Sequence, residues 1–207
     1  MKLAPLGALL ALALSPGCDR LLMPATHPVY APWEEGLTLG FEDPSLEPGL
    51  RVQRRQQVRV KESKPTGAGL AVIKTFTSMT GQWDSQVLQK DGGVNLQPGG
   101  ILLLPAGFPD RVSRWEARGC FNWVVGRSGV ELPGVRLADP GAAGVWVEST
   151  ALDGSGNRTR TLLLPDLGEV ETLTWIQGRW VTTNLLVTRG FTDVPAKAAA
   201  SPSGSKS

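Results

Sequence analysis

The segment LRVQRRQQVRVKE, residues 50–62, is the clearest guide to the fold of this chain. Its odd-numbered positions are all polar, from Arg51 to Lys61, and three of its even-numbered positions are valine. A period of two places alternate side chains on opposite faces of a β-strand, which here gives one cationic face and one half-apolar face. The segment therefore predicts a strand. Its basic face would either keep an outer strand face solvated, which discourages edge pairing, or bind acidic lipid headgroups, and both explanations stay open.

The same alternation, interrupted by turn residues, recurs along the chain. Strong turn signals include Asp91-Gly92-Gly93 and the hairpin loop over residues 153–157. The 25 glycines and 16 prolines argue against long helices. We expect an all-β fold, a meandering antiparallel protein of about ten strands. The expected strands are residues 50–62, 70–79, 83–90, 94–96, 111–118, 120–125, 130–132, 145–152, 158–164, 169–176 and 180–189.

The N-terminus has the pattern of a bacterial export signal. Lys2 is followed by an apolar run over residues 3–14 and by small residues before Cys18. A cysteine after Gly17 resembles the lipobox of bacterial lipoproteins, and that resemblance implies cleavage before Cys18 and acylation of its thiol. Ser15 departs from the pattern, which usually has a large aliphatic residue there. Cleavage after Ala13 and ordinary secretion is the alternative, whereas about 12 apolar residues span only about 18 Å, too little for a bilayer.

Composition shifts divide the chain into four parts. Residues 1–17 are the predicted signal peptide, and residues 18–33, rich in proline, are the predicted lipidated cysteine and tether. Residues 34–192 form the predicted antiparallel β domain. Residues 193–207 consist of Ala, Ser, Pro, Gly and Lys after Asp193 and Val194, and they are predicted to be disordered.

Charge and histidine content narrow the function classes. A formal net charge of +2 gives no electrostatic case for nucleic acid. The chain has one histidine, His27, in the predicted tether, so no Ser-His-Asp, Cys-His or zinc arrangement can be assembled. Cys120 lies in an apolar, aromatic stretch and is predicted to be a buried structural thiol. We expect no enzyme activity and no cofactor.

Four segments in order carry a further resemblance: residues 89–93, 102–105, 132–137 and 163–170. Together they resemble a loose group of uncharacterised bacterial periplasmic proteins and lipoproteins. The resemblance covers about residues 50–190 and implies a strongly curved antiparallel sheet or half-barrel. This shape is similar to that of the periplasmic lipoprotein carriers, the LolA/LolB-like half-barrel, from which no residue is transferred.

The seven tryptophans supply the candidate binding residues. Most lie in expected strands, so packing in the core is one interpretation. The other is a concave face open to an acyl chain or an envelope protein segment, with four candidates in neighbouring strands and the last hairpin: Trp115, Trp123, Trp175 and Trp180. The sequence thus predicts a lipoprotein of the bacterial cell envelope, facing the periplasm and tethered through Cys18. It would be a non-catalytic binding module or, alternatively, a structural component of an envelope complex.

Overall fold

The computed structural model describes residues 28–132, 134–137 and 141–192. It confirms the all-β prediction, with twelve strands in place of about ten. The elements are β1 (Leu37–Glu42), α1 (Pro48–Gln53), β2 (Gln56–Thr66), β3 (Gly69–Ser78), β4 (Gly81–Lys90), β5 (Gly93–Gln97), β6 (Ile101–Leu104), β7 (Arg114–Ala117), β8 (Cys120–Gly129), β9 (Ala143–Ala151), β10 (Arg158–Leu164), β11 (Gly168–Ile176) and β12 (Arg179–Phe191).

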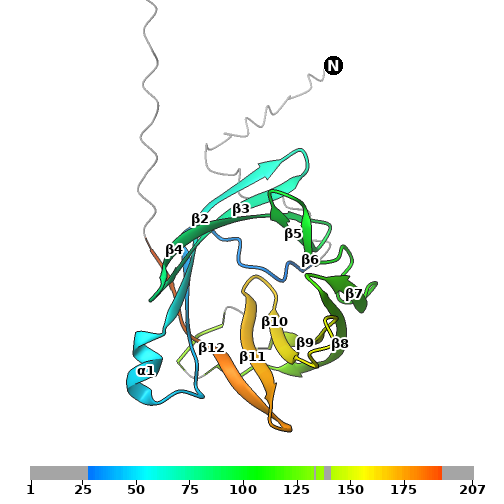
Figure 1. Cartoon of the computed structure of the whole chain (residues 1–207). Helices are drawn as coiled ribbons and strands as arrows, with labels where there is room; N and C mark the ends of the chain where they lie inside the picture. The colour runs from blue at the N-terminus through cyan, green and yellow to red at the C-terminus, as the bar shows by residue number, and fades with distance from the viewer. Residues whose placement is uncertain (1–27, 133, 138–140, 193–207) are drawn as a thin grey trace, which may run out of the picture.

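All strands belong to one antiparallel sheet that curls into a nearly closed barrel (Figure 1). The strand order is β6-β5-β4-β3-β2-β1-β12-β11-β10-β9-β8-β7. The four-residue strands β6 and β7 lie at the two edges of the sheet and approach each other without pairing. The predicted half-barrel is therefore closed further than expected, because twelve twisted strands bring the sheet edges together.

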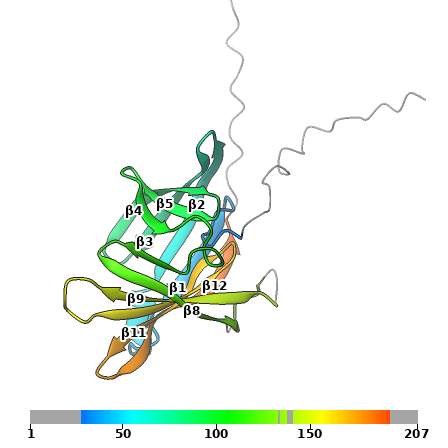
Figure 2. The ribbon, with the colours of Figure 1, turned by 90° about the vertical axis from the view of Figure 1, so that its right-hand side faces the viewer.

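The antiparallel meander places its connections alternately at two ends of the barrel. One end holds the connections after β2, β4, β6, β8 and β10, and the other holds those after β1, β3, β5, β7, β9 and β11. Figure 2 shows this for β9, which has the β8–β9 connection at one tip and the β9–β10 turn at the other. We call the first the closed end and the second the mouth.

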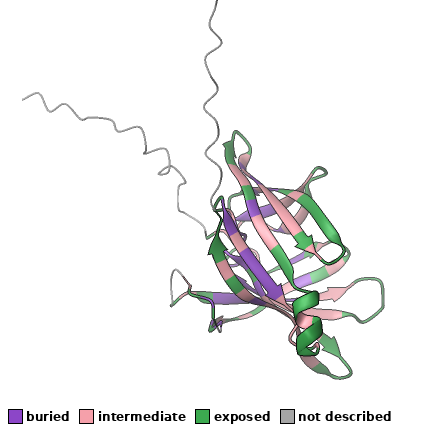
Figure 3. Ribbon diagram, turned by 90° about the vertical axis from the view of Figure 1, so that its left-hand side faces the viewer, coloured by how far each residue is buried: buried purple, intermediate pink, exposed green. Residues whose placement is uncertain are grey.

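The prediction of a strand over residues 50–62 is half wrong. Its first part is the short helix α1, and pairing in β2 begins at Gln56, opposite Phe41 of β1. Pro48 sits in the first helical turn, where its fixed φ and missing N–H are tolerated, and Arg51 N–H bonds to the Glu47 carbonyl at 3.0 Å. No residue of α1 is buried, as Figure 3 shows in green. Alternation alone does not make a strand where no neighbouring strand is within reach.

Two other expectations differ from the structure. Strands β1 and β6 were not predicted, although in β1 Leu37, Leu39 and Phe41 alternate and are all buried. Residues 130–132, predicted as a strand, have no strand pairing. Val130 is instead buried in the connection between β8 and β9, where its side chain lies close to Gly144 of β9. This connection covers the outer side of β9 and β10, so its apolar residues are buried outside the barrel.

An N-terminal strap, residues 28–36, crosses the closed end (Figure 1, blue). The Val29 carbonyl accepts a hydrogen bond from Asp166 N–H at 2.7 Å, and the Trp33 indole donates to the Asp166 carboxylate at 3.0 Å. Tyr30 is 5% exposed and its ring meets Phe108 edge to face at 5.1 Å. The tether predicted over residues 18–33 is therefore too long, because its described part belongs to the core. Residues 1–27 and 193–207 lie outside the described residues.

Within the described part of the chain, no helix is long and apolar enough to cross a membrane.

Candidate functional site

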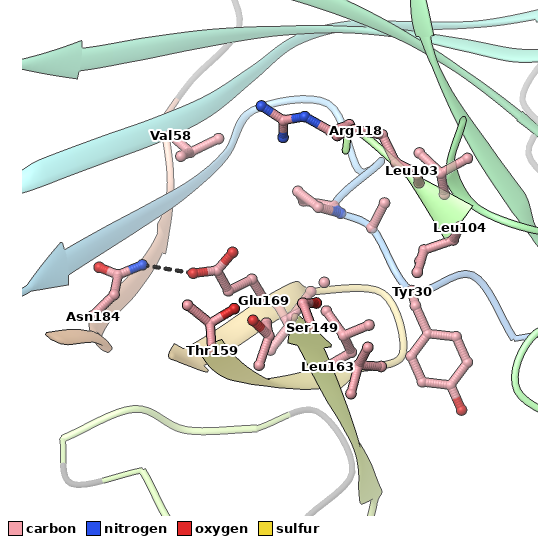
Figure 4. A pocket seen from close by; sticks show the side chains of 18 of the residues that line it. Tyr30, Val58, Leu103, Leu104, Arg118, Ser149, Thr159, Leu163, Glu169 and Asn184 are labelled. Carbon is pink, nitrogen blue, oxygen red and sulfur yellow. Dashed lines mark hydrogen bonds between the residues drawn. The ribbon is translucent and has the colours of Figure 1, made fainter. Parts of the chain in front are cut away.

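The barrel encloses a cavity of about 620 Å³ that is open to solvent (Figure 4). Inward-facing residues of most strands line it, and the strap supplies Tyr30, Ala31 and Pro32 at the closed end. A volume of this size lies within the range of about 300–1,000 Å³ that small-molecule pockets occupy. The cavity is the strongest candidate site in the described structure.

The two sides of the cavity differ in polarity. The wall from β1, β2, β3, β5 and β6 is mainly apolar, and we call it the apolar wall: Leu39, Phe41, Val58, Phe76, Val94, Leu103 and Leu104, together with the polar Gln56 and Lys74. The wall from β8 to β12 carries most of the uncharged polar groups, and we call it the polar wall: Asn122, Ser149, Thr159, Thr161, Glu169 and Asn184, together with the apolar Val147 and Leu163. Figure 4 shows Ser149, Thr159 and Glu169 on the side away from Val58 and Leu103. Such a cavity suits a molecule with an apolar face and hydrogen-bonding groups.

Hydrogen bonds hold the polar wall in place. Ser149 donates to the Asn122 side-chain oxygen at 2.6 Å, while the Asn122 amide donates to the Trp115 and Cys120 carbonyls. Asn184 donates to the Glu169 carboxylate at 2.8 Å, the bond drawn in Figure 4. The wall is therefore pre-organised before any ligand binds.

Lys74 is the lysine that lines the cavity. It alternates with Val72 and Phe76 along β3, and its Nζ lies 5.9 Å from the centre of the Phe76 ring. Protein atoms surround the amine, and this burial lowers the pKa of Lys74 to about 8, against the raising effect of the Glu169 charge. The side chain is nevertheless half-buried rather than buried, because the cavity leaves it accessible to water.

The mouth carries exposed apolar side chains on most of its turns. Five of its six connections have one at or next to them, and we call this set the apolar rim: Leu50, Val52, Met79, Ile101, Leu152 and Ile176. Among the described residues, the connections of the closed end bury theirs, as Phe108, Leu132 and Leu167 show. The two ends of the barrel therefore differ in surface chemistry, and the apolar rim surrounds the open one.

The structure separates the four candidate tryptophans. Trp115 of β7 faces inward, lines the cavity and meets Phe108 at 5.5 Å. Trp123 pairs with Glu148 and Trp175 with Trp180, all on the outer face of the sheet and outside the cavity lining. The binding role of these residues stays a prediction, but only Trp115 could report directly on the cavity.

The outer tryptophans surround a buried carboxylate. Glu148 of β9 is 1% exposed and accepts hydrogen bonds from Arg158 at 3.0 Å and Arg160 at 2.8 Å. The Arg160 guanidinium lies 4.5 Å from the Trp180 ring centre. Burial alone would raise the pKa of Glu148, but the hydrogen bonds and charges of the two arginines lower it. This cluster is internally satisfied and joins β9, β10 and β12 from outside.

The two cysteines and the histidine divide between the described and undescribed chain. Cys18 and His27 lie outside the described residues. Cys120 is a free, half-buried thiol that lines the cavity, and so it is more accessible than the buried thiol predicted from its neighbours. The described residues contain no group of three or more His, Cys, Asp or Glu side chains that could hold a metal.

Sequence reasoning missed the charged residues of the cavity. The signal for Lys74 was present, because a lysine stands in phase with Leu70, Val72 and Phe76 on the apolar face of β3. Glu169 and Asn184 had no comparable signal, since β-bulges in β10–β11 and β11–β12 pairing shift the alternation near both residues.

Comparison with solved structures identifies the same fold elsewhere. A crystal structure of a Bacteroides fragilis protein, described as exported and of YmcC-like fold, matches with a TM-score of 0.53 and 12% identity, covering 79% of this chain and 99% of that chain. A second, from Parabacteroides distasonis and described as a lipoprotein, has a TM-score of 0.45, 12% identity and the same coverage. No protein-family model and no curated protein matches the chain. At this identity the first likeness shows a shared fold alone.

Proposed function

We propose that this protein is an exported lipoprotein of the bacterial cell envelope, facing the periplasm, whose barrel binds an apolar or amphipathic ligand without catalysis. The single observation that carries the proposal is the solvent-open cavity of about 620 Å³ inside the barrel. Barrels of about eight strands are commonly filled by side chains, whereas larger ones can enclose a ligand cavity, and the twelve strands here make such a cavity possible.

The two-sided lining supports an amphipathic ligand. Apolar side chains such as Val58 and Leu103 offer burial to a hydrocarbon chain, and each CH₂ group buried contributes about 0.8 kcal/mol. The hydroxyl of Thr159 lines the cavity and has no hydrogen-bond partner among the described residues, so it can bond a polar ligand group. An acyl chain or an apolar partner segment fits this lining better than a wholly polar molecule.

The anchor proposal rests on the sequence around Cys18 and agrees with the description of the Bacteroides fragilis protein of this fold as exported. Nine residues lie between Cys18 and residue 28, and this stretch can span at most about 35 Å. Because the strap lies at the closed end, an acylated Cys18 would hold that end toward its membrane. The mouth would then face away from the anchoring membrane.

Metabolic labelling with a clickable fatty acid tests the anchor. We expect the wild-type protein to be labelled and Cys18→Ala to lose the label, because the thiol at Cys18 is the acylation site. Cys120→Ser is the matched control and should be labelled like the wild type. Unchanged labelling of Cys18→Ala would overturn the anchor proposal.

Tryptophan quenching by a brominated fatty acid tests the binding proposal on the soluble Cys18→Ala protein without its signal. Trp115 lines the cavity, whereas Trp175 lies on the outer face. We expect saturable quenching below the micelle concentration, strongly reduced in Trp115→Phe and kept in the control Trp175→Phe. No quenching at any such concentration would contradict ligand binding.

A second candidate is a structural or assembly component of an envelope complex that has no small ligand. The apolar rim favours it, because exposed apolar side chains gathered at one end of a molecule are typical of protein contact sites. In that case rim substitutions such as Met79→Ser and Ile176→Ser would release a co-purifying envelope protein, while the brominated fatty acid would leave the fluorescence unchanged.

A further inference from the structure

The cavity contains an amine that the fold does not pair. Lys74 has no hydrogen bond and no ion pair with any described residue. Its amine makes a cation–π contact with the Phe76 ring, whose centre lies 5.9 Å from Nζ. Its cross-strand neighbour Val60 is 1% exposed and its in-strand neighbour Val72 is fully buried. An aliphatic side chain would suit these neighbours better, because a charged group that is removed from water without a partner costs free energy.

The nearest carboxylate of the lining is already engaged. One oxygen of Glu169 accepts hydrogen bonds from both Asn184, at 2.8 Å, and Thr172, at 2.7 Å. Glu169 therefore influences Lys74 through space but makes no ion pair with it. A bound anion would not have to displace Glu169 in order to reach the amine.

A second cation faces the cavity from the mouth. Arg118 occupies the β7–β8 turn at a positive φ of 53°, and its guanidinium points into the cavity in Figure 4. No hydrogen bond or ion pair joins Arg118 to another described residue. With two cations against the one carboxylate of Glu169, the charged lining has a net positive charge. Such a lining attracts an anion and repels a cation.

We propose that the ligand is an amphiphile with one anionic headgroup, a carboxylate or phosphate on a hydrocarbon chain, and that this headgroup pairs with Lys74. This inference rests on the proposed function. The chain lies along the apolar wall, against Phe41 and Val58. Arg118 attracts the headgroup at the mouth and Lys74 receives it inside. The hydroxyl and amide groups of the polar wall complete the hydrogen bonds of the headgroup.

Matched probes separate the charge from the chain. Palmitate, the neutral hexadecanol and hexadecyl phosphate are titrated into the soluble Cys18→Ala protein at neutral pH. We expect both anions to bind about ten- to a hundredfold more tightly than hexadecanol, the range given by a hydrogen-bonded charge contact. The two anions distinguish a carboxylate from a phosphate headgroup.

Variants locate the contact. Lys74→Gln should bind palmitate no more tightly than hexadecanol, whereas Lys74→Arg, which keeps the charge, should retain most of the preference. Lys61→Gln is the matched control from the neighbouring strand, because Lys61 pairs with Asp84 on the outer face. Circular dichroism establishes that each variant is folded.

The outcomes distinguish this inference from the proposed function. Equal binding of palmitate and hexadecanol by the wild type, or a preference that survives in Lys74→Gln, would overturn the anionic ligand while leaving the cavity a binding site. Failure of all three probes to bind the wild type would overturn both proposals.

Discussion

Lys74 shows how a single buried charge can lower the stability of the fold. Its pKa of about 8 lies below the ordinary 10.5 because burial disfavours the charged amine. Between these two values the unfolded chain binds more protons than the folded protein, so stability rises with pH across this interval. At neutral pH the folded state carries the full cost of the buried charge.

Lys74→Met should therefore stabilise the protein at pH 7, by up to about 3 kcal/mol. The gain should shrink as the pH rises from about 8 toward 10.5, because the wild-type amine then loses its proton. Urea unfolding of both proteins at a series of pH values measures this. A gain that stayed constant with pH would indicate better packing by methionine instead of a charge effect.

Gly168 is the residue that lets the strap lie against the β10–β11 turn. Its φ is +76°, and a Cβ there would lie 3.0 Å from Pro32 and 3.1 Å from the Ala31 Cα. Gly168→Ala should lower the free energy of unfolding by about 2–4 kcal/mol, because alanine is strained at this positive φ and its Cβ would crowd the strap. Gly178→Ala has a similar φ of +80° but no neighbour within 4 Å, so it should lose only about 1 kcal/mol. Equal losses in thermal unfolding would show that the strap contact contributes nothing.

Glu148 tests the outer cluster. The pKa of Glu148 is lower in the folded state than its ordinary value of 4.5. The stability that the ionised carboxylate adds is therefore fully present above pH 4.5 and is lost as the pH falls through the folded-state pKa. Glu148→Gln should lose about 1–3 kcal/mol at pH 7, and the difference from wild type should narrow in acid. Asp110→Asn breaks the exposed pair with Arg127 and should change stability by less than about 1 kcal/mol. If the stability difference between Glu148→Gln and the wild type did not change with pH, the charge of Glu148 would not be the source of its stabilising effect.

Among the elements, the strap has the least regular structure and crosses one end of the barrel. It adds no strand to the sheet, yet Tyr30 and Ala31 are as buried as the strand residues beside them. Its edge-to-face contact continues from Phe108 to Trp115, so the strap also sets the floor of the cavity. The segment therefore belongs to the folded domain rather than to the linker that precedes it.

A soluble form that begins at residue 34 should be less stable than one that begins at residue 28, by about 3 kcal/mol or more. The reason is the loss of the buried Tyr30 ring, since removal of a buried aromatic side chain typically costs about 3–5 kcal/mol. Thermal unfolding of the two forms gives the difference, and Tyr30→Ala in the longer form is the matched control. Equal stability of the two forms would place the domain boundary where the sequence placed it.

On the scale of the whole molecule, the two ends of the barrel differ. The strap and the connections of the closed end bury their apolar residues, whereas the mouth exposes the apolar rim. Cys120, which begins β8 directly after the Arg118-Gly119 turn at the mouth, lines the cavity. A ligand that enters through the mouth would pass this thiol.

In the soluble Cys18→Ala protein, Cys120 should react with a small maleimide in the native state, and saturating palmitate should slow the reaction several-fold by covering the thiol. Mass spectrometry follows the adduct, and decanol at equal concentration controls for nonspecific effects of an amphiphile. Reaction only after unfolding would show that the thiol is closed off from the mouth. An unchanged rate despite quenching of Trp115 would place the ligand elsewhere in the barrel.

The sequence by itself determined the class of fold and many of its turns. Alternation marked most strands because one sheet face is enclosed and the other is wet, and Asp91-Gly92 forms a turn with both φ angles positive, as tight hairpins require. The same local reasoning fails at residues 50–53 and 130–132, where the pattern is right but no strand lies alongside. Strand formation needs a partner, which a single stretch of sequence does not contain.

Only the tertiary structure decided which of the two faces is enclosed and what gathers there. Alternation places Trp123, Trp175 and Trp180 on one face of their strands without saying that this face is the outer one. Barrel closure and the bulges in the β1–β12, β10–β11 and β11–β12 pairings set the inward residues, and they bring Lys74 of β3 into the same cavity as Glu169 of β11. These two residues are almost a hundred positions apart in the chain. Their physical cause is the curvature of the whole sheet, which no local pattern encodes.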